Sequence, residues 1–188
     1  MFPIRDTIPS RCAPVAMWFL IIINVAIFLF ETSLPEPLLE RLVYIFGLVP
    51  NRLLTQSWIV KTGLAWNLLP LITHMFLHGN WAHILSNMWA LWIFGDNVED
   101  RMGPLRFTIF YLSCGIIAGL TQWRMHPSSL LPMVGASGAV AGVLGAYFVM
   151  YPYARVVTLV PIFFWPFFFE LPAVIYLLFW FVSQLFSG

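Results

Sequence analysis

Charged side chains are scarce in this sequence. Asp, Glu, Lys and Arg make up 9% of the 188 residues, whereas a soluble globular domain carries about 25%. Hydrophobic residues make up 61%, and they include 18 Phe and 9 Trp. The deficit of charge excludes an ordinary soluble domain, and the aromatic residues suit lipid-facing surfaces and the interfacial belts of a membrane protein. We therefore expect a polytopic membrane protein.

Several other features are missing. The formal net charge is +1 and the Lys and Arg residues form no cluster, which gives no reason to expect nucleic acid as a partner. The only two cysteines, Cys12 and Cys114, lack the spacing of a disulfide framework or of a metal site, and we interpret both as packed thiols. The apolar segments contain almost no paired ionisable residues and no inverted repeat, which disfavours a transporter.

The apolar segments predict an all-α fold, a helical membrane bundle of about five spans. Pro14 suits the first position of a helix, and the uncharged residues 15–30 that follow form the first expected span. The next three spans are expected at residues 81–94, 104–122 and 137–150. Glu170 and Pro172 open the fifth, which runs through Ser183. We interpret residues 1–13 as an N-terminal cytoplasmic tail and residues 14–188 as the membrane domain.

The connections between these spans differ in character. Residues 31–80 are expected to hold short interfacial helices, including the amphipathic segment Leu38–Phe46 and the polar segment Asn51–Lys61. Gly95 is expected to end the second span, so that residues 96–106 form a charged loop. Residues 151–166 are interpreted as a turn with an apolar, proline-marked stretch. The distribution of Lys and Arg favours a cytoplasmic N-terminus, and we expect a multi-pass protein of a bacterial inner membrane.

The segment from Gly135 to Ala146 is rich in small residues and carries Ser137 near its start. A helix from Ser137 to Met150 would be about 21 Å long, shorter than the hydrocarbon core of roughly 30 Å. The preceding residues are a poor helix former because Pro127 and Pro132 interrupt them. The short helix would therefore begin inside the membrane, where irregular backbone is tolerated beside a water-filled cavity. A nucleophile and water could meet there, at the positive end of a helix dipole.

The Gly-x-Ser-Gly tetrad also has a purely structural interpretation. Gly138, Gly142 and Gly145 would form a face on which another helix can pack closely. A serine hydroxyl is a poor nucleophile at neutral pH and needs an activating base. The tetrad alone therefore leaves both interpretations open.

Polar side chains within the second expected span are further candidates. His83 and Asn87 are four residues apart and share one helix face, so that with the backbone N–H of Ser137 they could stabilise a tetrahedral oxyanion. The alternative is an interhelical hydrogen bond. His74 and His78 are also four apart, but no carboxylate or cysteine lies near them. We therefore favour a positioning role or interface hydrogen bonds over a metal site.

Together these motifs resemble those of the rhomboid intramembrane serine proteases. They are, in order, His78-x4-His83-x3-Asn87, Gly95-x3-Glu99-x-Arg101-x-Gly103 and Gly135-Ala136-Ser137-Gly138. Residues 2–9, 76–83 and 92–101 are also characteristic, and the resemblance covers nearly the whole chain.

The resemblance implies a role for each residue of these motifs. Ser137 would be the nucleophile, and His83 and Asn87 would line the oxyanion pocket. Five residues would support the motifs: His78, Glu99, Arg101, Gly135 and Gly138. Family members cleave transmembrane helices of other proteins near the bilayer surface, so the implied partners are transmembrane substrates and the lipid bilayer, with no metal or cofactor.

The sequence also departs from the family pattern. In rhomboid proteases a sixth span carries the histidine that activates the serine, whereas none of the histidines here follows Ser137. The position four residues after the serine, often aromatic in the family, is Ala141. Either the sequence is truncated or the chain is an inactive relative, and the intact motifs favour truncation. We expect a rhomboid-type serine endopeptidase that, as written, has a nucleophile and an oxyanion pocket but no matching general base, which leaves the activity of this chain open. The alternative is a non-catalytic membrane adaptor that binds transmembrane helices.

Overall fold

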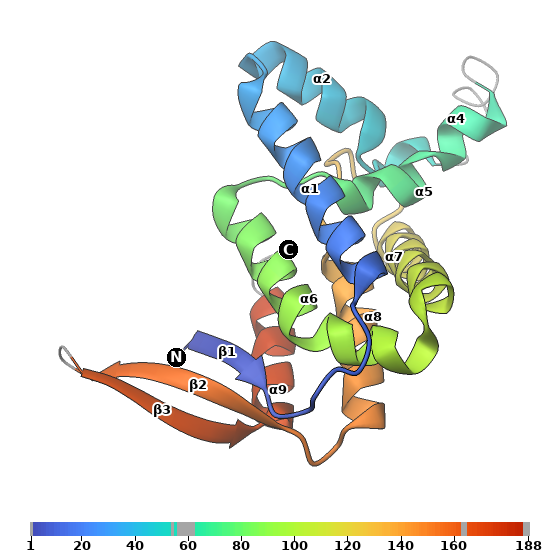
Figure 1. Cartoon of the computed structure of the whole chain (residues 1–188). Helices are drawn as coiled ribbons and strands as arrows, with labels where there is room; N and C mark the ends of the chain where they lie inside the picture. Colours follow the sequence, from blue (N-terminus) through green and yellow to red (C-terminus); the bar gives the residue numbers. More distant parts are fainter. Residues whose placement is uncertain (1, 54, 56–62, 163–164, 186–188) are drawn as a thin grey trace.

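The computed structural model describes residues 2–53, 55, 63–162 and 165–185. Helices dominate this part of the chain, and a small antiparallel sheet lies beside one end of the bundle (Figure 1). The elements, in chain order, are β1 (Phe2–Asp6), α1 (Val15–Ser33), α2 (Glu36–Phe46), η1 (Pro50–Arg52), α4 (Leu64–Leu68), α5 (Pro70–Thr73), η2 (His74–Phe76), α6 (Trp81–Met102), α7 (Pro104–Met125), α8 (Ser137–Met150), β2 (Arg155–Ile162), β3 (Trp165–Pro172) and α9 (Ala173–Leu185).

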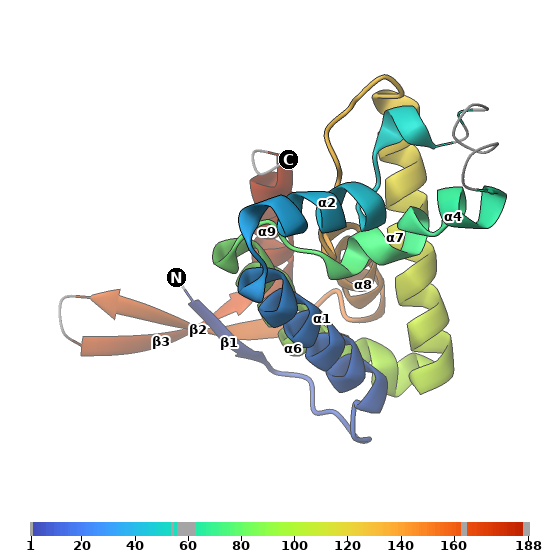
Figure 2. The ribbon, with the colours of Figure 1, turned by 90° about the horizontal axis from the view of Figure 1, so that it is seen from above.

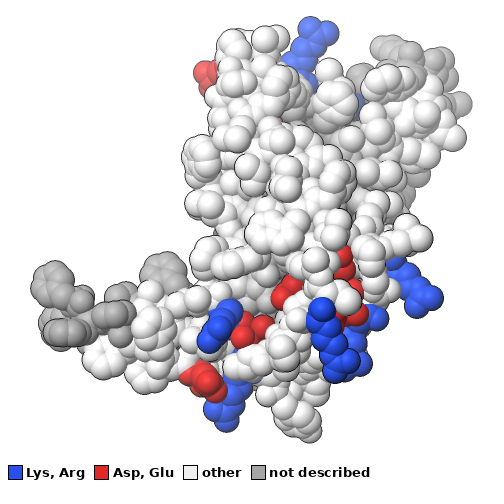
Figure 3. Space-filling view, in the orientation of Figure 1, with Lys and Arg blue, Asp and Glu red and all other residues white. Residues whose placement is uncertain are grey.

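All five segments predicted as spans contain helices. Among the described residues, α1 and α7 are long and apolar enough to cross a membrane, with 19 and 22 residues. The helix α6 is as long as α7 but ends in charged residues, and α8 and α9 have only 14 and 13 residues. The helical part of the predicted fold is confirmed, and the count of five spans stays a prediction. Charged side chains gather towards the two ends of the molecule, with a wide uncharged surface between them (Figure 3).

The short helix α8 lies among α6, α7 and α9 (Figure 2). Its bounds, Ser137 and Met150, are those predicted. A Cβ atom on Gly138 would overlap Ala118 of α7, and one on Gly142 would overlap Cys114 of the same helix. These two glycines therefore allow α7 and α8 to approach closely, which confirms the structural interpretation for Gly138 and Gly142. A Cβ atom on Gly145 would meet nothing within 4 Å, so the interpretation was wrong for that residue.

The predicted end of the second span was wrong. Helix α6 continues through Gly95 to Met102, so Glu99 and Arg101 belong to its last turns and not to a loop. Gly95 does not break the helix but packs against α1, because a Cβ atom there would lie 3.2 Å from Cγ of Met17. The helix ends instead at Gly103, which has a φ of +77° and precedes the proline that starts α7.

The prediction of an all-α fold was wrong for the three strands. The order of strands is β1-β2-β3, and both pairs are antiparallel. The described residues of this segment, 155–162 and 165–172, were predicted as a turn followed by the start of the fifth span but form the strands β2 and β3, and α9 begins only at Ala173. Valine, threonine and phenylalanine are enriched in this segment and favour strands. Residues 2–6 of the predicted tail pair with β2; the proposed division at residue 13 stays a prediction.

The segment between α1 and α6 is made of short elements, as predicted. Helix α2 contains the amphipathic residues 38–46, whereas most of the segment Asn51–Lys61 lies outside the described residues. The hydroxyl of Thr73 donates a hydrogen bond to the carbonyl of Phe46 over 2.6 Å, which ties α5 to the end of α2. This segment leads directly into the loop that carries His78.

Candidate active site around Ser137

Ser137 is the first residue of α8 and is half-buried. The first helical hydrogen bond runs from the amide of Val140 to the carbonyl of Ala136 over 2.9 Å. The amides of Ser137, Gly138 and Ala139 therefore precede the i→i−4 ladder, and the positive end of the helix dipole lies at the serine. This arrangement suits a developing negative charge beside Ser137.

The loop before Ser137 is held by two segments that are distant in sequence. The amide of Gly135 donates to the carbonyl of His74 over 2.9 Å, and Met133 exchanges two backbone hydrogen bonds with Leu48. Gly135 has a φ of +119°, which side-chain-bearing residues rarely adopt. The backbone entering α8 is thus fixed by the chain between α2 and α6.

The imidazole of His83 lies against Gly135. A Cβ atom built on Gly135 would lie 2.5 Å from both Cε1 and Nε2 of His83, so only glycine allows the ring to sit there. His83 is in the first turn of α6, where its amide donates to Oδ1 of the N-cap residue Asn80 over 2.8 Å. The structure therefore brings His83 to the segment two residues before Ser137.

Asn87 lies one turn further along α6 and is almost completely buried. Its Nδ2 donates to the carbonyl of His83 over 3.0 Å, while its Oδ1 has no hydrogen-bond partner among the described residues. Nδ2 carries two hydrogens, so one remains for another acceptor. The shared helix face predicted for His83 and Asn87 is consistent with this contact.

His78 connects this site to the end of α1. Its amide donates to Oε2 of Glu31 over 3.2 Å, and its ring makes edge contacts with His83, at 5.2 Å between centroids, and with Phe28. Neither ring nitrogen has a hydrogen-bond partner in the described part of the chain. Burial and, to a lesser degree, the neighbouring His83 together lower the pKa of His78 to about 4, so His78 is neutral at physiological pH.

Glu31 was missed by the sequence analysis. It is buried, although it ends the apolar run of the first span. A carboxylate at that position was the available signal, because ionisable residues within membrane segments usually have a partner. His74 was assigned a positioning role or an interface hydrogen bond. Its Nδ1 lies 2.7 Å from the carbonyl of Pro70, and its own carbonyl holds Gly135.

Glu99 lies at the opposite end of α6 and joins two helices. Its carboxylate accepts hydrogen bonds from the amides of Ala16 and Met17 over 2.9 and 2.7 Å. It thereby caps the N-terminus of α1, which has no capping side chain of its own. Nε of Arg101 donates to the hydroxyl of Tyr151 over 3.2 Å. The part of the predicted supporting motif formed by Glu99 and Arg101 therefore joins α6 to α1 and to the residue that follows α8.

A second junction holds β1 against the bundle at this end. Oδ2 of Asp6 accepts hydrogen bonds from the hydroxyl of Tyr147 over 2.6 Å and from Nδ2 of Asn97 over 2.9 Å. Burial is the main reason that the pKa of Asp6 is raised, to about 6. No local pattern predicts this contact, because it joins residues 141 positions apart.

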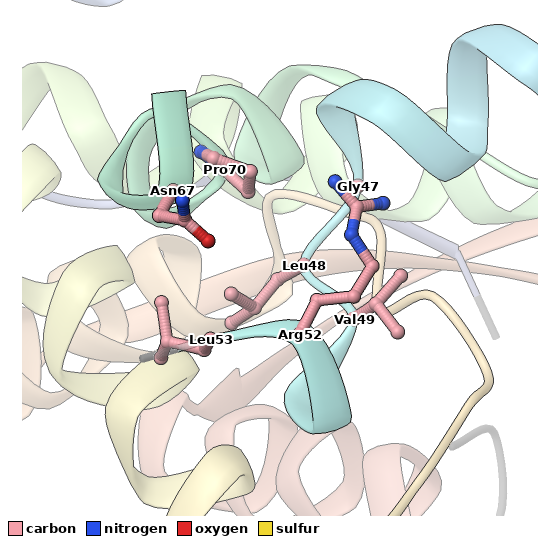
Figure 4. Close-up of a pocket in the computed structure, with 7 residues that line it drawn as sticks. All are labelled: Gly47, Leu48, Val49, Arg52, Leu53, Asn67 and Pro70. Atoms are coloured by element: carbon pink, nitrogen blue, oxygen red, sulfur yellow. The ribbon is translucent and has the colours of Figure 1, made fainter. Parts of the chain in front are cut away.

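Two hollows lie outside the predicted site. A pocket between the end of α2 and the start of α5 is about 10 Å³ in volume, enough for roughly one water molecule, and Arg52 is among the residues that line it (Figure 4). The guanidinium of Arg52 stacks on the ring of Tyr44. An apolar groove of about 280 Å³ separates α8 from α9. It is lined by Ala141, Leu144, Gly145, Phe148, Val174, Leu177, Leu178, Trp180 and Phe181.

These features define an integral membrane protein with a serine at the head of a short internal helix and a histidine packed beside it. The model of the Rhomboid domain family matches residues 65–188. The chain belongs to the rhomboid family.

Several curated proteins are similar to parts of the chain. Rhomboid-like protein 11, chloroplastic, of Arabidopsis thaliana is 42% identical over 71 residues, which are 38% of this chain and 25% of that protein. Rhomboid protease GluP of Bacillus subtilis is 38% identical over 102 residues, 54% of this chain and 18% of the relative. Rhomboid protein 1, mitochondrial, of Saccharomyces cerevisiae is 30% identical over 126 residues, which are 63% of this chain and 36% of that protein. The chain thus spans well under half the length of these relatives.

Proposed function

We propose that this chain carries the nucleophile and the oxyanion-binding part of a rhomboid-type serine endopeptidase that cleaves transmembrane protein substrates. The observation that supports this most is the contact of the His83 ring with Gly135, two residues before Ser137 at the start of α8. It brings a ring N–H donor, a helix N-terminus and a serine hydroxyl into one region. Similarity to a protein named as a rhomboid protease supports the same reaction class.

In the proposed reaction Oγ of Ser137 bonds to the carbonyl carbon of the scissile peptide, and the electron pair of the C=O bond moves to the oxygen. The N–H groups of Ser137, His83 and Asn87 donate hydrogen bonds to that oxyanion. The C–N bond then breaks as the leaving amine takes a proton, and water hydrolyses the acyl-serine. The substrate helix has to unwind first, because its carbonyls are engaged in i→i−4 hydrogen bonds.

The proton of Ser137 needs a base. The rhomboid pattern assigns this role to a histidine that follows the serine, and this sequence has its histidines at positions 74, 78, 83 and 126. The reaction is therefore tested in the chain as given and in the same chain extended by the downstream coding sequence. A base supplied from outside residues 1–188 predicts a gain of activity in the extended chain.

A fluorophosphonate probe tests the nucleophile without a substrate. In the chain extended by the downstream coding sequence, we expect one covalent adduct per chain, located by mass spectrometry on Ser137 and absent from Ser137→Ala. His83→Ala and Asn87→Ala should cleave a model transmembrane substrate about 10²–10³-fold more slowly than the parent while still inserting into the membrane. Equal labelling of the parent and of Ser137→Ala would rule out the nucleophile assignment.

The second candidate function is a non-catalytic adaptor that binds transmembrane helices. The apolar groove between α8 and α9 favours it, because Gly145 and Ala141 leave room there for the backbone of another helix. An adaptor would bind a transmembrane peptide equally well with and without Ser137→Ala and would release no cleaved product from the extended chain. A protease would lose its product on the same substitution.

A further inference from the structure

The β2–β3 hairpin exposes aromatic side chains on both of its faces. Phe167, Phe168 and Phe169 follow one another in β3 and are 44%, 60% and 48% exposed. Because neighbouring residues of a strand point to opposite faces, neither face of this part of the hairpin is covered. The rings of Phe167 and Phe169 stack on one face, with their centroids 6.4 Å apart. A hairpin surrounded by water would carry polar residues on at least one face.

Apolar side chains are exposed again on α9, beyond the charged Glu170 at the root of the hairpin. Strand β3 ends at Pro172 and α9 begins at Ala173, whose amide donates to the carbonyl of Ala154 over 2.8 Å. The helix carries its own exposed apolar side chains: Val174, Ile175, Leu178, Phe179, Phe181 and Val182. A predicted span with such a surface faces lipid. This lipid-facing helix follows directly after β3, which favours lipid over a soluble protein as the partner of the hairpin.

The sheet sets a limit on the depth of the hairpin. Strand β3 is an edge strand, because the order of strands is β1-β2-β3. Its outward backbone groups need hydrogen-bond partners, and the hydrocarbon core of a bilayer supplies none. The headgroup layer contains water and polar groups, so an edge strand is tolerated there. The backbone of the hairpin therefore cannot be immersed among the acyl chains.

The charged side chains at the root of the hairpin indicate the same depth of the hairpin in the membrane. Nη1 of Arg155 lies 3.9 Å from Oε2 of Glu170, diagonally across β2 and β3, and both side chains are more than half exposed. Figures 1 and 3 show the hairpin projecting sideways from the end of the molecule where acidic and basic side chains gather. The root of the hairpin thus lies at the polar edge of the bundle, while Phe167–Phe169 extend the apolar surface outward from it.

We propose that the β2–β3 hairpin is a lipid-binding element that lies along the membrane surface, at the boundary between headgroups and acyl chains. The rings of Phe167–Phe169 reach the outer part of the acyl chains, and the free edge of β3 stays among headgroups and water. This inference concerns the seating of the protein in the bilayer and does not depend on the proposed protease activity.

Depth-dependent fluorescence quenching tests the proposal. Cys12→Ser and Cys114→Ala remove the native thiols, and Phe168→Cys then carries an environment-sensitive fluorophore in vesicles of phosphatidylcholine and phosphatidylglycerol. Lipid nitroxides at acyl carbon 5 or 12 act as shallow and deep quenchers. We expect the shallow quencher to act at least twofold more strongly on the label at position 168. Phe179→Cys on α9 is the deep reference, and Ser10→Cys in the exposed N-terminal segment is the aqueous reference.

Each other result overturns the proposal. A label at position 168 that neither quencher reaches, as at position 10, would place the hairpin in water. Deep quenching equal to that of position 179 would place it in the hydrocarbon core. Shielding from both quenchers that grows with the protein-to-lipid ratio would show that a second copy covers the face. Circular dichroism of each labelled variant confirms that the helical content is retained.

Discussion

Replacing Gly135 by alanine tests how the site around Ser137 is held. The added Cβ atom would lie 2.5 Å from Cε1 and Nε2 of His83, whereas ordinary contacts begin near 3.4 Å, so the ring has to retreat by about 1 Å. The φ of +119° adds strain, because holding a residue with a side chain in such a conformation costs about 1–3 kcal/mol. Retreat is hindered on one side, since the ring of His78 lies 5.2 Å away.

We therefore expect Gly135→Ala to lower the free energy of unfolding by about 1–3 kcal/mol and the rate of cleavage or probe labelling by about 10²-fold. Stability is measured by denaturant unfolding in detergent micelles, and the rate by fluorophosphonate labelling of Ser137 in the extended chain. The matched control is Gly145→Ala in α8, where an added Cβ atom meets nothing within 4 Å. The control should be neutral or slightly stabilising, because alanine favours helix over glycine.

Equal stability of Gly135→Ala and Gly145→Ala would refute the reasoning about the Gly135 backbone and its contact with His83. A loss of stability without a change in the labelling rate would keep the packing argument and remove His83 from the reaction. The two measurements thus separate the structural role of the contact from its proposed chemical role.

Three further substitutions probe the opposite end of the molecule. Glu99→Gln should lower the free energy of unfolding by about 1–3 kcal/mol, measured in detergent, because α1 loses a charged cap. Tyr147→Phe should loosen β1, which amide hydrogen exchange would report as faster exchange of residues 2–6, and should raise the pKa of Asp6 further. Asp6→Asn should remove a pH dependence of stability. The pKa of Asp6 is about 6 in the folded protein against an ordinary value of 3.8. The stabilisation by Asp6 is therefore full below about pH 4 and is lost as the pH rises through 6.

Exposed residues of the same types serve as controls for these substitutions. Glu40→Gln in α2 and Tyr153→Phe in the turn after α8 change side chains that lie on the surface, so they should leave unfolding and hydrogen exchange unchanged. An unfolding curve of Glu99→Gln that superimposes on that of Glu40→Gln would contradict the capping role. A stability profile of Asp6→Asn that still falls between pH 4 and 6 would assign the titration to another group.

The sequence predicted α8 well because its signals are local. A segment that two prolines make a poor helix former precedes Ser137, and small apolar residues follow it without a break. The end of α6 was predicted wrongly, since Gly95 resembles a helix terminator in sequence but serves as a contact surface for α1 in the fold. Whether a glycine ends a helix or packs a neighbour depends on a partner that is distant in sequence.

The sheet was missed for a related physical reason. A strand that is apolar on both faces shows no alternation of polar and apolar residues, so residues 165–172 could not be distinguished from the start of an apolar helix. The pairing of β2 with β1 joins the two ends of the chain and has no local signal. In the site, spacing predicted the shared face of His83 and Asn87, but the contacts of His83 with Gly135 and of Glu31 with His78 arise only from the tertiary fold.

The pairing of Phe2–Asp6 with β2 makes the assembly of this protein dependent on the order of synthesis. Asp6 lies opposite Val156, so the ribosome has to add about 150 residues before the first strand meets its neighbour. At roughly 5–20 residues per second, the newly made amino terminus waits on the order of 8–30 s for that neighbour. During this interval the edge of β1 that pairs with β2 lacks its partner, and a chain interrupted before residue 155 would leave that edge without it.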